Sequence, residues 1–112
     1  ISVTGVQTCA LPIFTGTESV QVESISLQSI FNLHKINSCE FLKVDCEGEE
    51  YAILESLPST HYEKIRKICI EYHFADTKPQ LLDGLIKKLD SFSFEIKTRK
   101  ILPDIGFLYA RK

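Results

Sequence analysis

Apolar residues recur along the chain with two different periods, which predict alternating helices and strands. A spacing of three or four residues predicts helices over 27–35, from the residues after Gly48 to Leu57, and over 77–90. Continuous or alternating apolar residues predict strands over 41–46, 67–74, 92–96 and 105–110. This order of elements builds a parallel sheet with helices on both faces, and the short loop 98–104 predicts a final antiparallel hairpin. The expected fold class is therefore α/β.

Local signals predict where two of the helices begin. Ser26 can accept a hydrogen bond from an unpaired N–H in the first turn of the first helix, so it is expected to be the N-cap. Thr77-Lys78-Pro79-Gln80 has the pattern of a capping box with proline in the first turn. Thr77 is therefore the expected cap of the third helix.

Charged residues gather where the strand over 41–46 passes into a helix. Asp45 and Glu47 follow the apolar residues of the strand, and Gly48 permits a tight backbone turn. In open α/β sheets, ligands bind outside the carboxyl ends of the strands. This joint is therefore the expected site of chemistry.

A second charged pair lies at the end of the next strand, where Glu71 and His73 fall on one face. The carboxyl ends of neighbouring parallel strands meet at one edge, so Asp45, Glu47 and His73 are expected to cluster. Like charges would raise the pKa of one carboxylate, and a charged His73 would lower it. A carboxylate or histidine placed there can act as a general base, so these three residues are the catalytic candidates.

A structural role for the joint is an open alternative. Asp45 or Glu47 could accept the free N–H groups at the start of the following helix. Glu50 has the spacing of the buried stripe of that helix, so it faces inward and needs a partner. Lys43 is the expected partner, in a buried ion pair that fixes the joint without doing chemistry.

Composition bounds the class of protein. The 112 residues suffice for one domain, and a formal net charge of -2 gives no reason to expect nucleic acid or an anionic membrane as a partner. The longest apolar runs fall well short of the roughly 20 residues that span a bilayer. The chain is therefore expected to be soluble.

The cysteines and histidines show no metal-ligand spacing. The four cysteines form no CxxC pair, so no zinc or other metal site is expected from them. Reduced thiols in a cytoplasmic protein are the favoured interpretation, with a disulfide framework as the alternative.

The first thirteen residues, Ile1 to Ile13, differ in kind from the rest. Residues 3–13 resemble the in-frame translation of a short-read sequencing adapter. We therefore expect 1–13 to be a non-native segment and 14–112 to be the genuine domain. The alternative is a real amino-terminal strand.

The pattern from the joint to the second strand resembles the FkbM-type methyltransferase family over about Val20 to Ala110. That family has a strand reading K-[IV]-D-x-E-G-x-E, then a helix, then a strand ending in E-x-H. The positions that match are Lys43, Asp45, Glu47, Gly48, Glu50, Glu71 and His73. An acidic pair in the family's preceding helix is replaced here by Gln28 and Ser29.

The resemblance implies a partial Rossmann-like, class I methyltransferase fold and an S-adenosylmethionine-dependent O-methyltransferase. The methyl acceptor would be a hydroxyl of a sugar or other secondary metabolite. Lys43, Gly48, Glu50 and Glu71 would support the catalytic candidates. The family binds its cofactor at a glycine-rich turn, and the five glycines here include no GxGxG, so no cofactor-binding residue is assigned. We therefore expect the carboxyl-terminal half of the domain, inactive by itself.

Two other functions remain open at this level. One is a non-catalytic α/β binding domain that keeps the joint for packing. The other is a divalent-metal site on Asp45, Glu47 and Glu50, since oxygen ligands suit magnesium or calcium, although no calcium-loop spacing is present. The oligomeric state is not indicated.

Overall fold

The computed structural model describes residues 21–112, so the predicted non-native segment Ile1–Ile13 lies outside the described residues. The helices are α1 (Leu27–Leu33), α2 (Glu50–Ser56), α3 (Ser59–Tyr62) and α4 (Pro79–Ser91). The strands are β1 (Leu42–Val44), β2 (Lys67–Tyr72), β3 (Glu95–Leu102) and β4 (Ile105–Arg111). The observed order of elements agrees with the predicted α/β class, with α3 added.

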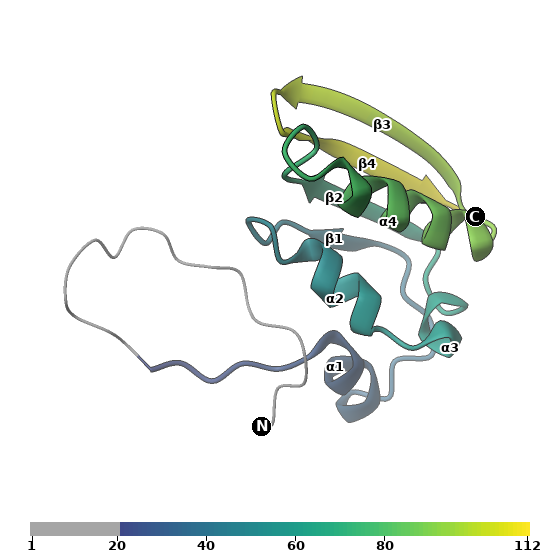
Figure 1. Cartoon of the computed structure of the whole chain (residues 1–112). Coiled ribbons are helices and arrows are strands. Elements are labelled where there is room, and N and C mark those ends of the chain that lie inside the picture. The colour runs from purple at the N-terminus through teal and green to yellow at the C-terminus, as the bar shows by residue number, and fades with distance from the viewer. Residues whose placement is uncertain (1–20) are drawn as a thin grey trace.

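The four strands form one sheet in the order β1-β2-β4-β3. β1 and β2 are parallel, with Leu42 opposite Ile68, whereas β4 is antiparallel to both β2 and β3. α2 lies in front of β1, and α4 lies in front of β2 and β4 (Figure 1). A mainly parallel sheet was predicted from the sequence, but only β1 and β2 pair in parallel. The last strand, β4, lies between β2 and β3.

The apolar core lies between the sheet and the helices. It joins side chains of α2, β2, α4 and β4, among them the fully buried Leu54, Ile70, Leu89 and Leu108. Burial of such side chains stabilises the fold by about 1.5–3 kcal/mol each. This packing holds α2 against the end of β2, where the charged residues lie.

The hairpin differs from its predicted form. β3 begins at Glu95 and continues to Leu102, through most of the segment that was expected to be a loop. Its backbone pairs with β4 from Glu95 opposite Arg111 onward. Cross-strand hydrogen bonds of an edge strand do not need an apolar sequence. The polar residues 97–100 therefore gave no apolar pattern from which this strand could be predicted.

Of the two predicted helix caps, one is confirmed and one is wrong. The Ser26 side chain accepts a hydrogen bond from the N–H of Ser29 at 3.1 Å. The N-cap of α4 is Lys78, and the N–H and hydroxyl of Thr77 both donate to Asp104 Oδ1, at 2.8 and 2.9 Å. Thr77 therefore ties the loop after β2 to the β3–β4 turn instead of capping a helix.

The thiols agree with expectation in part. Cys39 and Cys69 are free, whereas Cys46 is disulfide-bonded, so the prediction of reduced thiols is wrong for Cys46. Cys9 lies outside the described residues.

Helix length bears on membrane insertion. Across residues 21–112, no helix has both the length and the apolar character needed to cross a bilayer.

Candidate functional site

The joint between β1 and α2 is a tight turn with unusual backbone angles. β1 ends at Val44, and the turn places Glu47 at φ 51° and Gly48 at φ 106° before α2 begins at Glu50. A side chain at Gly48 would have its Cβ 2.5 Å from Cε2 of Phe74. The close approach of the Phe74 ring therefore requires glycine at this position.

The residues after β2 close against this turn. Phe74 has φ 60°, a left-handed conformation that is uncommon for a bulky residue. Left-handed residues thus flank the site on both loops, at Glu47 and at Phe74. Backbone strain of this kind concentrates at functional sites.

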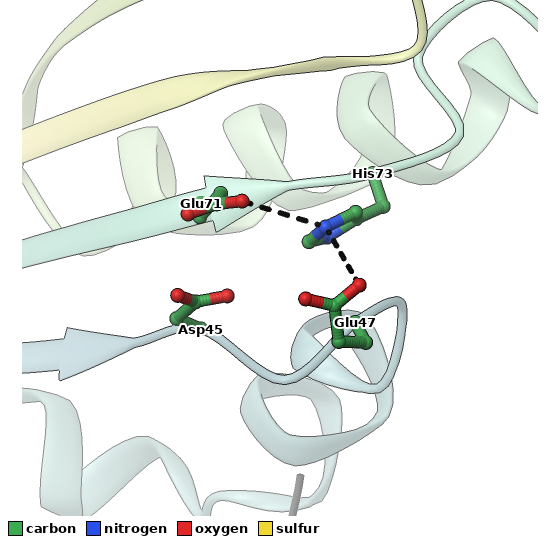
Figure 2. A group of neighbouring side chains, drawn as sticks. All are labelled: Asp45, Glu47, Glu71 and His73. Carbon is green, nitrogen blue, oxygen red and sulfur yellow. Dashed lines mark ion pairs between the residues drawn. The ribbon is translucent and has the colours of Figure 1, made fainter. Parts of the chain in front are cut away.

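Four side chains from the two loops and strand ends form one group, which we call the acidic cluster: Asp45, Glu47, Glu71 and His73 (Figure 2). One nitrogen or oxygen atom of each lies within 4.8 Å of the others. His73 Nε2 lies 3.6 Å from Glu47 Oε2 and 3.7 Å from Glu71 Oε1. The clustering of Asp45, Glu47 and His73 expected from the strand order is therefore observed, while their catalytic role stays a prediction.

Glu50 lies beneath the acidic cluster and is fully buried. Its Oε1 accepts a hydrogen bond from the His73 backbone N–H at 2.8 Å and lies 2.9 Å from His73 Nδ1. Its Oε2 accepts a hydrogen bond from the Gly48 N–H at 2.7 Å. The partner of Glu50 is therefore His73, and the predicted Lys43–Glu50 pair is wrong because Lys43 is exposed on the strand.

Tyr51, the next residue of α2, also contacts His73. Its hydroxyl donates a hydrogen bond to the His73 carbonyl oxygen. Burial, together with the charge of Glu50, raises the pKa of Tyr51 to about 12, so the hydroxyl keeps its proton. Sequence reasoning missed Tyr51, since an aromatic residue in the first turn of a helix gives no signal for such a contact.

The pKa values of Glu71 and His73 are both raised in the acidic cluster. Burial, followed by the charge of Asp45 and a hydrogen bond with Asp45, raises the pKa of Glu71 above its ordinary 4.5. Burial works to lower the pKa of His73, but the hydrogen bond and charge of Glu50, with the charges of Glu47 and Glu71, raise it above 6.5. The cluster therefore favours an additional proton, held by the imidazole or between carboxylates.

The same four side chains could hold a cation. Carboxylate oxygens and an imidazole nitrogen are ligands that divalent metal ions accept. Glu50, which the sequence placed in such a site, has both oxygens engaged by His73 and Gly48. The donor set would therefore be Asp45, Glu47, Glu71 and His73.

The raised pKa of His73 predicts how stability depends on pH. A histidine whose folded-state pKa exceeds its unfolded value stabilises the fold below the unfolded value, and this contribution is lost as pH rises through the folded pKa. We therefore expect the free energy of unfolding to fall as pH rises above about 6.5. Denaturant unfolding should be measured at several pH values across this range. The free energy of unfolding should fall less steeply with pH in His73→Gln than in the unchanged protein.

The control for this measurement is His34→Gln, because His34 is exposed at the end of α1. In this variant the free energy of unfolding should depend on pH as it does in the unchanged protein. An equal slope in His73→Gln and the unchanged protein would contradict the assignment of this titration to His73.

Comparison with known proteins adds the family. The profile of the Methyltransferase FkbM domain matches residues 6–108. The matched range starts inside 1–13, and the expected boundary at residue 13 stays a prediction. Searches of curated proteins and of solved structures gave no match. Because the match spans most of the chain and includes the acidic cluster, the protein belongs to the methyltransferase FkbM domain family.

Proposed function

We propose that the protein contributes the proton-accepting part of an S-adenosylmethionine-dependent O-methyltransferase site. The methyl acceptor is a hydroxyl of a sugar or other secondary metabolite. The observation that carries this proposal is the acidic cluster, in which a buried, hydrogen-bonded His73 faces carboxylates at the carboxyl ends of β1 and β2. Family membership supports the methyl-transfer chemistry.

The residues of the acidic cluster suit this reaction. S-adenosylmethionine, when bound, supplies a methyl group activated by a positively charged sulfonium. Carboxylates complement that positive charge, so their gathering at one edge fits such a cofactor. No cofactor-binding residue is assigned, because the sequence contains no glycine-rich turn of the GxGxG kind.

The chain's own residues have two tasks in the reaction. Asp45 and Glu47 would hold the acceptor molecule through its neighbouring hydroxyl groups and so orient the reacting oxygen. The reacting hydroxyl would donate its one hydrogen to His73 Nε2, which would take this proton while methyl transfer breaks the carbon–sulfur bond of the cofactor and forms the carbon–oxygen bond. The resulting imidazolium is stabilised by Glu50, Glu47 and Glu71, the groups that already raise its pKa.

The test compares cofactor binding with methyl transfer. Calorimetry should detect no S-adenosylmethionine binding to this chain alone, whereas the product of the complete open reading frame containing 14–112 should bind it. In that protein, His73→Gln should lower kcat for a hydroxyl acceptor by about 10²–10⁴-fold, the usual contribution of a general base. Cofactor affinity should change little.

Glu49→Gln is the matched control, because Glu49 is an exposed carboxylate in the same turn with no side-chain capping bond. It should retain kcat. A complete protein that does not bind S-adenosylmethionine would reject the proposal and favour the non-catalytic binding domain.

A further inference from the structure

We propose that Glu50 is a positioning residue that holds His73 in the tautomer with the proton on Nδ1, so that Nε2 presents its lone pair to the acidic cluster. The inference concerns a residue that does not itself reach the reacting atoms. It rests on the proposed function only for the step in which Nε2 accepts the hydroxyl proton.

Both side-chain oxygens of Glu50 face backbone donors. Oε2 accepts a hydrogen bond from the Gly48 N–H at 2.7 Å, and Oε1 accepts one from the His73 N–H at 2.8 Å. A backbone N–H can only donate, so both oxygens of Glu50 act as acceptors at the start of α2.

The ring nitrogen Nδ1 of His73 lies 2.9 Å from the same oxygen, Glu50 Oε1. Because this oxygen already accepts from the His73 N–H, it is placed to accept from Nδ1 as well, which puts the hydrogen of that contact on Nδ1. In the neutral ring the lone pair then belongs to Nε2, the nitrogen that lies 3.6 Å from Glu47 and 3.7 Å from Glu71.

His73 is held at several points. Glu50 binds both the ring and the backbone N–H of His73, and Tyr51 donates to the His73 carbonyl oxygen. Two consecutive residues in the first turn of α2 thus fix His73 at its ring and on both sides of its backbone. The His73 side chain is only 9% exposed, so water has little access to compete for Nδ1. A carboxylate that fixes one ring nitrogen determines the role of the other.

The experiment measures the tautomer directly by nitrogen NMR of histidine-labelled protein. At a pH above the pKa of His73, its Nδ1 should have the chemical shift of a protonated ring nitrogen and its Nε2 that of a bare one. A major form with the proton on Nε2 would overturn the proposal. The measurement on the unchanged protein decides the question, even if every variant unfolds.

Variants add a readout that packing alone would not move. Leucine at position 50 removes the acceptor beside Nδ1, so Glu50→Leu should populate the Nε2–H form. In the complete protein it should also lower kcat by at least about 10-fold with little change in KM, because a misplaced proton impairs the base. Glu49→Leu should leave both readouts unchanged. A Glu50→Leu protein that keeps the Nδ1–H form and full kcat would contradict the positioning role.

These outcomes separate this inference from the proposed function. An Nδ1–H tautomer in a complete protein without methyl transfer supports the positioning of His73 and rejects the methyltransferase proposal. Methyl transfer in a protein with an Nε2–H tautomer supports the proposed function and rejects the role of Glu50.

Discussion

Replacing Glu50 with leucine is expected to lower the free energy of unfolding by about 3–5 kcal/mol, the usual cost of removing one member of a buried charged pair. The side chain is fully buried and accepts from the Gly48 N–H, the His73 N–H and His73 Nδ1. Leucine fills a similar volume, but it leaves three donors without an acceptor in a place that water does not reach. Each unsatisfied buried donor costs about 1–3 kcal/mol, partly offset by relaxation.

Denaturant unfolding followed by circular dichroism measures this loss. The matched control is Glu49→Leu, which makes the same chemical change one residue earlier at an exposed position. Its free energy of unfolding should change by no more than about 0.5 kcal/mol. If both variants unfold at the same denaturant concentration, the hydrogen bonds of Glu50 do not hold the joint.

The double variant Glu50→Leu/His73→Leu distinguishes the contribution of the imidazole contact from that of the two backbone hydrogen bonds. Removing the imidazole takes away one unsatisfied donor but leaves the two backbone N–H groups. The double variant should therefore recover only part of the loss. Full recovery would mean that the ring contact alone carries the effect, and additive losses would mean that the two side chains are not coupled.

The sequence predicted the elements whose formation is local. Ser26 begins α1 as expected, because an N-cap needs only a hydroxyl beside the first turn. β2 was predicted from its own apolar run. The strand predicted over 92–96 is wrong at both ends. Phe92 is the C-cap of α4, and β3 runs from Glu95 to Leu102 because its polar residues form a strand only by pairing with β4. Thr77 was misassigned for the same reason, since its partner Asp104 is distant in sequence and near only after the hairpin forms.

In the candidate site, too, some features could be predicted from the sequence and others depend on tertiary packing. Parallel pairing of β1 and β2 follows from the alternation of elements, and it was enough to predict that Asp45, Glu47 and His73 would cluster. The inward direction of Glu50 was also predicted from helical spacing. Its partner was not, because Lys43 is near in sequence while His73 is near in space. The reach of a buried side chain across two loops depends on tertiary packing that periodicity does not encode.

The second large loss of stability is expected from Gly48→Ala, in the turn between β1 and α2. Gly48 has φ 106°, a conformation that alanine adopts only at a cost, typically about 1–2 kcal/mol for left-handed residues. The new Cβ would also lie 2.5 Å from Cε2 of the Phe74 ring, and such overpacking costs about 1–3 kcal/mol. The variant should therefore unfold at a clearly lower temperature.

Gly84→Ala provides a control of opposite sign for the same substitution. Gly84 lies inside α4, and a Cβ there meets no atom within 4 Å, so alanine should raise the free energy of unfolding by about 0.5–1 kcal/mol. Thermal unfolding of the two variants beside the unchanged protein measures both signs in one experiment. A stabilising Gly48→Ala would mean that the turn relaxes freely and that Phe74 does not pack on it. A destabilising result, with a weakened His73–Glu50 contact by NMR, would show that the ring of Phe74 and the glycine turn together hold His73 against α2.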